Sequence, residues 1–325
     1  MKNYYHTLLM LGLYTSACSG DGYNPMFTPS QPGTILEGSL DQNGRTSDAE
    51  GEDSENKKQE PENSGPDDLA DELAEDIDES DECDLPSTDF YKEKGPFEVA
   101  TKSASQKTFF YPKNPKPGCQ YPAMGWGNGM GVSGSSAYRA FNSHLASWGV
   151  HVCAHHGAGA SSGREASSCL SAIVEDNEVN QQIGEKRLTA GHSMGGGGAV
   201  NGADRDDVVA LISVQTCASA SGGGLTKAGL YLTGTSDWAN CNSTTKSTFQ
   251  RHTGEAFLGV YAGAGHVDTP LGRGAGAAEY RGISVAWALC WASDMSAACE
   301  LFRGGSDAGI KEQGKWVDLK SKNID

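Results

Sequence analysis

The sequence predicts an α/β fold built on a mostly parallel sheet, and two observations lead to this prediction. From about residue 84 onward, short apolar runs typical of buried strands alternate with longer stretches typical of helices. Strands that alternate with helices in this way indicate βαβ units on a parallel sheet. The second observation is a Gly-x-Ser-x-Gly motif at residues 191–195, which lies between one of these strands and a helix of small residues.

The expected elements follow one another along the chain in a regular order. We expect strands at residues 97–100, 108–111, 123–126, 150–154, 187–190, 208–214, 228–232 and 256–261. We expect helices at residues 136–147, 165–175, 196–203, 244–251 and 279–292. No helix separates the first two strands, which favours an antiparallel start of the sheet. Residues 304–325 are glycine-rich and then polar, and we assign them to a C-terminal tail outside a folded domain at 84–303.

The formal net charge of -17 is concentrated in one segment. Residues 48–84 contain 18 Asp and Glu side chains but only two lysines, so the rest of the chain is nearly neutral. Residues 19–83 have few aromatics and no lasting apolar period, and such a stretch cannot bury enough surface to offset its chain entropy. We therefore expect an acidic, disordered linker at 19–83. The absence of a basic patch argues against nucleic-acid binding, and the absence of a D-x-D-x-D-G loop favours a solvated charge run over a calcium site.

The first eighteen residues predict a signal for export. Lys2 gives a short positive start, and residues 7–13 form an apolar run that is too short to span a bilayer. The following Thr15-Ser16-Ala17-Cys18 resembles the bacterial lipobox, in which the cysteine is lipidated, although Thr15 stands where an aliphatic residue is usual. Several acyl chains at Cys18 would anchor the protein stably. The alternative is an ordinary signal peptide that is cleaved nearby, which releases a soluble exported protein.

Cysteine usage agrees with export. Apart from Cys18, the chain has an even number of cysteines, namely Cys83, Cys119, Cys153, Cys169, Cys217, Cys241, Cys290 and Cys299. An even count in an exported chain predicts disulfides, although eight cysteines allow 105 connectivities. Among these, Cys217 with Cys241 and Cys290 with Cys299 are the preferred local pairs. The chain has no C-x-x-C spacing, so we expect no zinc site.

The Gly-x-Ser-x-Gly motif predicts a nucleophile elbow, the tight strand-to-helix turn that holds a catalytic serine above an α/β-hydrolase sheet. Ser193 is the expected nucleophile. Gly191 and Gly195 lack the β-carbons that would collide with the neighbouring strand and helix. The amide of Met194 is the first expected oxyanion donor, because it lies at a helix N-terminus that favours negative charge.

The remaining members of a catalytic triad follow in the chain order that this fold requires, acid and then histidine, each on a loop after a later strand. Asp237 follows the strand at 228–232, and His266 follows the strand at 256–261. A serine hydroxyl is a poor nucleophile without a base, and that base needs a carboxylate to hold its tautomer. We therefore expect His266 to be the general base and Asp237 to orient it.

Other residues compete for these two roles. His252 also follows Asp237, but it lies in a polar stretch before the strand, so we expect it at the surface. Asp268 lies only two residues from His266 on the same loop. Three acids that follow the helix after the serine are expected at the opposite end of the sheet, namely Asp204, Asp206 and Asp207.

The second oxyanion donor should come from the loop at 127–131, which follows the strand at 123–126. Its glycines allow a backbone amide to approach an oxyanion closely, and Asn128 is the preferred position, with Gly129 second. The alternative is a flexible turn without a catalytic role. His155 ends a strand nearby, and the residues that we expect to line the cleft are His192, Gly129, His156, Gln215 and Trp238.

Residues 95–300 resemble the bacterial cutinase-like polyester hydrolases, which include PET hydrolases. The resemblance rests on the motif at 191–197, on the loop acid and histidine that follow it, on Tyr111-Pro112 and on the Cys290/Cys299 pair. It implies ester hydrolysis without a cofactor in a shallow, lidless cleft. The chain departs from this family in two places. Asn128 stands where an aromatic residue is usual, and Gln215-Thr216-Cys217 stands where members place a tryptophan in the cleft.

These expectations combine into one predicted function, an exported serine esterase that acts as a monomer on small esters or polyesters. We expect no cofactor and no metal, and a membrane contact only through a lipid on Cys18. One alternative is a carbohydrate esterase that removes acetyl or feruloyl groups from cell-wall polymers. The other is of a different class, a catalytically inactive surface-binding lipoprotein that keeps only the fold.

Overall fold

The computed structural model describes residues 83–86, 89–158, 160–303 and 307–324. All of them belong to the unit Asp71–Asp325. The expected export signal at 1–18, the lipidation site at Cys18 and the acidic linker up to residue 82 lie outside the described residues.

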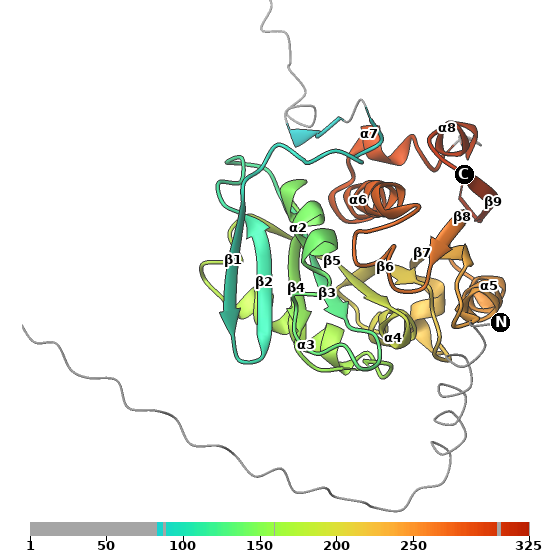
Figure 1. The fold of residues 1–325 in the computed structure, drawn as a ribbon. Coiled ribbons are helices and arrows are strands. Elements are labelled where there is room, and N and C mark those ends of the chain that lie inside the picture. The colour runs from blue at the N-terminus through green and yellow to red at the C-terminus, as the bar shows by residue number, and fades with distance from the viewer. Residues whose placement is uncertain (1–82, 87–88, 159, 304–306, 325) are drawn as a thin grey trace, which may run out of the picture. The chain divides into compact units, whose positions relative to one another are not determined.

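A mixed sheet forms the centre of this unit (Figure 1), and in the described residues it has nine strands in the order β1-β2-β4-β3-β5-β6-β7-β8-β9. The strands β3 to β8 run parallel to their neighbours, whereas β1, β2 and β9 pair antiparallel. The strands are β1 (Val99–Ala104), β2 (Lys107–Pro112), β3 (Tyr121–Gly127), β4 (His151–His155), β5 (Ile183–His192), β6 (Val208–Val214), β7 (Ala228–Ser236), β8 (Ala256–Gly265) and β9 (Trp316–Lys322).

Helices cover both faces of the sheet (Figure 1). On one face lie α2 (Arg139–Ser147) and α6 (Ala277–Ser293), and on the other lie α3 (Arg164–Glu175), α4 (Met194–Gly202) and α5 (Cys241–Arg251). The shorter helices are η2 (Gly223–Thr226), α7 (Ser296–Cys299) and α8 (Asp307–Glu312). The predicted α/β architecture with a mostly parallel sheet is therefore confirmed.

Two hydrophobic cores result from this arrangement, one on each face. Side chains along a strand point alternately to opposite faces, and β6 shows the consequence. Ala210 and Ile212 join the core beneath α2 and α6, whereas Leu211 joins the core beneath α3, α4 and α5. Because both faces are covered, the central strands are continuous apolar runs, which is why they can be predicted from the sequence.

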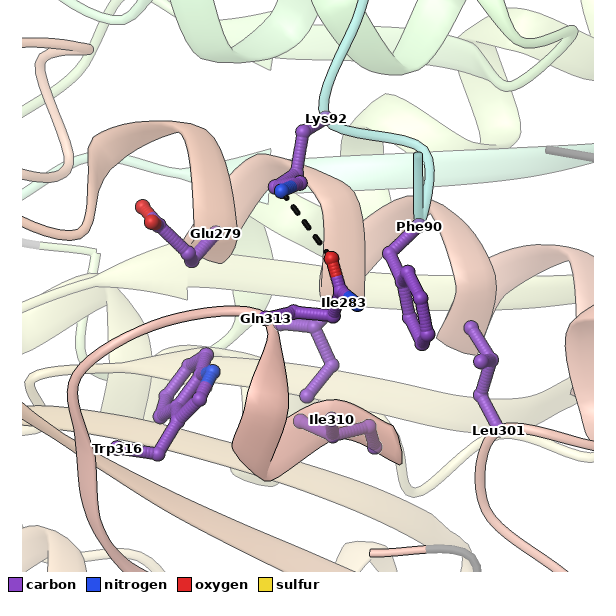
Figure 2. Close-up of a pocket in the computed structure, with 8 residues that line it drawn as sticks. All are labelled: Phe90, Lys92, Glu279, Ile283, Leu301, Ile310, Gln313 and Trp316. Carbon is purple, nitrogen blue, oxygen red and sulfur yellow. Dashed lines mark hydrogen bonds between the residues drawn. The ribbon is translucent and has the colours of Figure 1, made fainter. Parts of the chain in front are cut away.

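The C-terminal segment belongs to the sheet, which differs from its assignment to a separate tail. β9 pairs antiparallel with β8 at the edge of the sheet. Its sequence is mainly polar because an edge strand has few buried positions, and Trp316 provides the main anchor by packing against Tyr261 and Tyr280. Figure 2 shows a small apolar pocket at this junction, where Trp316 lies near Ile283 of α6 and Ile310 of α8.

Four disulfides join the eight cysteines of the described residues, namely Cys83–Cys119, Cys153–Cys169, Cys217–Cys241 and Cys290–Cys299. Both preferred local pairs are confirmed. Disulfides in this number indicate a protein that folds in an oxidising compartment and is secreted or extracellular. Among the described residues, no helix combines the length and the apolar character that crossing a membrane requires.

Buried histidines should make the fold sensitive to acid. Burial lowers the pKa of His151 on β4 from 6.5 to about 4, and it lowers the pKa of His144 on α2 to about 4 as well. Between pH 6.5 and about pH 4, the folded state therefore binds fewer protons than the unfolded state. The free energy of unfolding consequently falls as the pH decreases through this range.

For His151 alone, we expect the free energy of unfolding to fall by about 2 kcal/mol between pH 7 and pH 5. Urea unfolding at the two pH values measures this loss. The variant His151→Asn keeps a donor for the carbonyl of Val179, which His151 Nδ1 contacts at 2.7 Å, but it cannot be protonated. It should lose correspondingly less stability, and an equal loss in both proteins would contradict the assignment.

Candidate active site

Ser193 lies in a strained turn between β5 and α4. Its φ of 58° is unusual for a residue other than glycine. The two glycines of the motif are required by close backbone contacts, because a β-carbon on Gly191 would lie 2.2 Å from the carbonyl oxygen of Gly195. A β-carbon on Gly195 would in turn lie 2.1 Å from the carbonyl oxygen of Gly127. The motif therefore brings the serine turn into direct contact with the end of β3.

His266 and Asp237 meet Ser193 at the carboxyl edge of the sheet. His266 Nε2 lies 3.0 Å from Ser193 Oγ, and His266 Nδ1 lies 3.1 Å from Asp237 Oδ1. The second contact is within ion-pair distance, but the Asp237 oxygen is not aligned to accept a hydrogen bond from His266 Nδ1. The Asp237 side chain is fully buried, and its Oδ1 also accepts the amide of Ala239 at 3.0 Å.

The rival residues are placed elsewhere. His252 is buried rather than exposed as expected, because Tyr231 Oη contacts its Nδ1 at 2.8 Å and the carbonyl of Lys227 contacts its Nε2 at 2.7 Å. Asp268 is largely exposed, and its carboxylate lies 3.7 Å from Arg273.

Asp207 lies where β6 begins, at the far end of the sheet from Ser193. It pairs with Arg205 and Arg187, and the Arg205 guanidinium holds the pKa of the Asp207 carboxyl low, at about 2. This carboxylate therefore has a structural ion pair at the opposite edge and does not reach His266.

His192, expected in the cleft wall, is instead buried beneath it in a chain of hydrogen bonds. The amide of Gly129 donates to Tyr138 Oη at 3.1 Å, and Tyr138 Oη contacts His192 Nδ1 at 2.8 Å. His192 Nε2 in turn contacts the carbonyl oxygen of His266 at 2.7 Å. Burial is the main reason that the pKa of His192 is lowered to about 3, so the ring is neutral. Since a carbonyl can only accept, Nε2 carries the proton and Nδ1 accepts from the tyrosine.

Gln215 holds the same loop from the other side. It was also expected in the cleft wall, but its side chain is completely buried. Gln215 Nε2 donates to the carbonyl of Gly265 at 2.8 Å, while its own amide donates to the carbonyl of Leu232 at 2.7 Å. Its φ of 45° shows that the backbone is turned sharply to allow this. Two buried side chains therefore hold the successive carbonyls of Gly265 and His266. No pattern in the sequence predicts that His192 and Gln215 hold this loop, because each donates to a carbonyl more than forty positions away along the chain.

The loop after β3 contains the two expected oxyanion positions, Asn128 and Gly129. Asn128 is buried, and its side-chain amide contacts the carbonyls of Gly134, His155 and Gly157 at 3.3, 2.7 and 3.1 Å, so its side chain holds loops together. The amide of Gly129 already donates to Tyr138.

Gly129 lies against Ser193. A β-carbon on Gly129 would be 3.3 Å from the β-carbon of Ser193 and 3.1 Å from His192 Nδ1, so only glycine fits there without displacement. His156 contacts Thr108 Oγ1 at 2.9 Å, and no contact of this side chain in the described residues reaches Ser193.

No family model matches the chain, and no curated protein matches it. The function must therefore be inferred from the geometry of the site.

Three exposed apolar side chains belong to the loops that carry the site. Met130 and Trp238 are 63% and 72% exposed, and Val267 adjoins His266 in the sequence. The Trp238 ring meets the His266 ring edge-on, with 5.5 Å between centroids. Exposing a tryptophan to water is unfavourable, so these side chains provide an apolar surface beside Ser193. Trp238, expected to line a cleft, therefore lies exposed beside His266.

The hydrogen-bond chain through His192 leads to a prediction about activity. In His192→Phe, the carbonyl of His266 loses its donor, so His266 is less well held. For ester hydrolysis at Ser193, kcat should then fall by about tenfold to 100-fold with little change in KM. In His192→Gln, the side-chain amide still reaches that carbonyl, and we expect most of the activity to return. Steady-state kinetics on a p-nitrophenyl ester measures both. Equal losses in the two variants would show that the hydrogen bond to His266 is unimportant.

Proposed function

We propose that this protein is a serine esterase with the α/β-hydrolase fold. The observation that carries the proposal is the continuous contact from Asp237 through His266 to Ser193. The order of strands β1 to β8, with β2 antiparallel to its neighbours, supports the hydrolase fold. The burial of the three side chains around an exposed apolar rim supports reaction with an ester rather than with a charged ligand.

The proposed reaction is acyl transfer in two steps. Ser193 Oγ attacks the ester carbonyl while His266 Nε2 takes its proton, and the histidine then gives this proton to the leaving alkoxide. Asp237 stabilises the imidazolium that forms between these events. Water attacks the acyl-enzyme in the second step with the same base, which releases the acid and restores Ser193.

The negative oxygen of the tetrahedral intermediates needs at least two amide donors. Met194 is the first residue of α4, so its amide has no acceptor within the helix. Since the amide of Gly129 donates to Tyr138, the backbone amide of Asn128 stays the preferred second donor, because the contacts of Asn128 with neighbouring loops come from its side chain.

The exposed rim favours esters with apolar acyl groups, as in cutinase-like polyester hydrolases. If Trp238 packs against the acyl chain, Trp238→Ala should raise KM for p-nitrophenyl butyrate about threefold to tenfold while kcat changes little. Val317→Ala is a matched control, because this valine is also exposed but lies on β9. A fall in kcat alone would show instead that Trp238 acts through His266.

Activity and active-site labelling together test the proposal. The purified protein should hydrolyse p-nitrophenyl esters, and a fluorophosphonate should label one serine, identified as Ser193 by peptide mass spectrometry. Comparing acetylated xylan with an aliphatic polyester film then separates a carbohydrate esterase from a polyesterase. Absence of both hydrolysis and labelling in folded protein would refute an esterase function.

The proposal places this enzyme at the cell envelope through a lipid on Cys18. Thr15-Ser16-Ala17-Cys18 is the feature that motivates it. Labelling of growing cells with a fatty-acid analogue should mark the wild-type protein and leave Cys18→Ser unmarked. Release of both proteins into the medium without label would contradict the anchor.

A further inference from the structure

The Cys217–Cys241 disulfide lies directly against the proposed catalytic base. Cys217 Sγ is 3.7 Å from His266 Nε2, the same nitrogen that contacts Ser193. Cys217 Sγ, Cys241 Sγ and one ring nitrogen of His266 all lie within 4.8 Å of one another. In the described residues this is the one group of three potential metal-ligating side chains gathered so closely.

The two cysteines are held close together by contacts other than the disulfide itself. The amide of Thr216 donates to Thr245 Oγ1 at 2.8 Å, and Thr245 Oγ1 donates to the carbonyl of Cys241 at 2.9 Å. Both threonines are completely buried. The amide of Cys217 also donates to the carbonyl of Ser193 at 3.1 Å. Breaking the S–S bond therefore leaves both sulfur atoms beside His266.

We propose that reduction of this disulfide creates a site for a soft divalent cation such as Zn²⁺, with Cys217, Cys241 and His266 as ligands. A dithiol reductant supplies two electrons and two protons to the two sulfurs and leaves as a cyclic disulfide. Zn²⁺ then displaces the two thiol protons and binds the lone pair of His266 Nε2. Cysteine thiolates and imidazole are the ligands that zinc prefers in proteins.

The geometry requires only a small movement. Two sulfurs bound tetrahedrally to one zinc at about 2.3 Å each are about 3.8 Å apart, so they need only to separate from their bonded distance. Cys217 is partly exposed, which gives a reductant access to the bond, whereas Cys241 is buried. Ser193 Oγ, which also contacts His266 Nε2, is close enough to approach the fourth position.

Occupation of this site has a consequence that rests on the proposed esterase function. The nitrogen that binds the metal can no longer accept the proton of Ser193, so Zn²⁺ should inhibit the reduced enzyme. The oxidised enzyme has no thiolates to offer and should be insensitive to the same metal concentration. The disulfide would then determine whether zinc controls the enzyme.

Cobalt is a suitable probe because thiolate-bound Co²⁺ absorbs in the near ultraviolet, which a structural role of the cysteines would not produce. The protein is reduced with dithiothreitol, desalted without oxygen and titrated with Co²⁺. We expect one Co²⁺ per chain with thiolate and tetrahedral absorption bands, complete displacement by Zn²⁺, and no bands for the oxidised protein.

Variants identify the ligands. The double variant Cys217→Ser/Cys241→Ser should lose the bands, and His266→Ala, which keeps both thiols, should bind Co²⁺ about tenfold more weakly or worse. Cys83→Ser/Cys119→Ser removes a distant disulfide and should bind Co²⁺ like the wild type. Circular dichroism checks that each variant is folded. Unchanged bands in the first variant, or no bands in the reduced wild type, would overturn the proposal.

The inhibitory consequence has its own readout. Zn²⁺ should lower fluorophosphonate labelling of Ser193 by about tenfold or more in the reduced protein, and a chelator should restore it. If the oxidised protein is not labelled, the esterase function fails while the cobalt spectra still decide the metal site. If cobalt binds but zinc leaves labelling unchanged, the inhibitory role of the site is refuted.

Discussion

Replacing Ser193 with alanine should lower kcat for p-nitrophenyl butyrate by about 10⁶-fold and abolish fluorophosphonate labelling. The reason is that Ser193 Oγ is the atom 3.0 Å from His266 Nε2, so its removal leaves the base without a nucleophile. Stopped and continuous hydrolysis assays measure the loss. Binding of the substrate should be little changed, because the rim residues Met130 and Trp238 are untouched.

A second serine, which immediately precedes Asp237 in the sequence, provides the control for this result. Ser236 ends β7 beside Asp237 and is exposed, so Ser236→Ala should hydrolyse the ester at nearly the wild-type rate. The thermal unfolding of Ser193→Ala should be close to that of the wild type, because alanine keeps the backbone hydrogen bonds of the turn and removes only the hydroxyl that contacts His266. Retention of ester hydrolysis by a folded Ser193→Ala protein would exclude the proposed mechanism.

Asp237→Asn should lower kcat by about 10⁴-fold. The buried carboxylate faces His266 Nδ1 at 3.1 Å, where it favours the tautomer with a proton on that nitrogen and stabilises the imidazolium. An asparagine amide has nearly the same shape but no charge, and it favours the opposite tautomer. Steady-state kinetics across the pH range measures this loss of kcat. The loss should become smaller only at high pH, where hydroxide can take the proton of Ser193 in place of His266.

Asp268→Asn is the matched control for this prediction. Asp268 lies two residues after His266 and is largely exposed beside Arg273, so its charge is screened by water. We expect the kcat of the Asp268→Asn variant to remain within about twofold of the wild-type value. A large loss in Asp268→Asn together with a small loss in Asp237→Asn would transfer the role of the acid to Asp268.

The strands of the central sheet are predictable because they are buried on both faces. β5, β6, β7 and β8 are apolar runs between glycine-rich or polar loops, and covered parallel strands require that composition. β9 could not be predicted in the same way. Only one of its side chains, Trp316, is buried, and its pairing with β8 depends on a surface that α6 and α8 create.

The candidate triad could be predicted from the chain order because Ser193, Asp237 and His266 each follow a strand, and parallel strands end at the same edge of a sheet. The supporting side chains could not. His192 and Gln215 were expected in the cleft wall, but both are buried and donate to backbone carbonyls next to the base. Such contacts depend on the path of two loops, which periodicity does not describe.

Patterns along the chain were enough to predict the alternation of strands and helices, the glycines of the serine turn and the order of Ser193, Asp237 and His266. These features are local, because they follow from burial patterns and from backbone sterics within a few residues. The three-dimensional arrangement alone shows the placement of β9, the tautomer of His192 and the position of the Cys217–Cys241 disulfide against His266. Each of these depends on groups far apart in the chain, whose distances are set only when both faces of the sheet are packed.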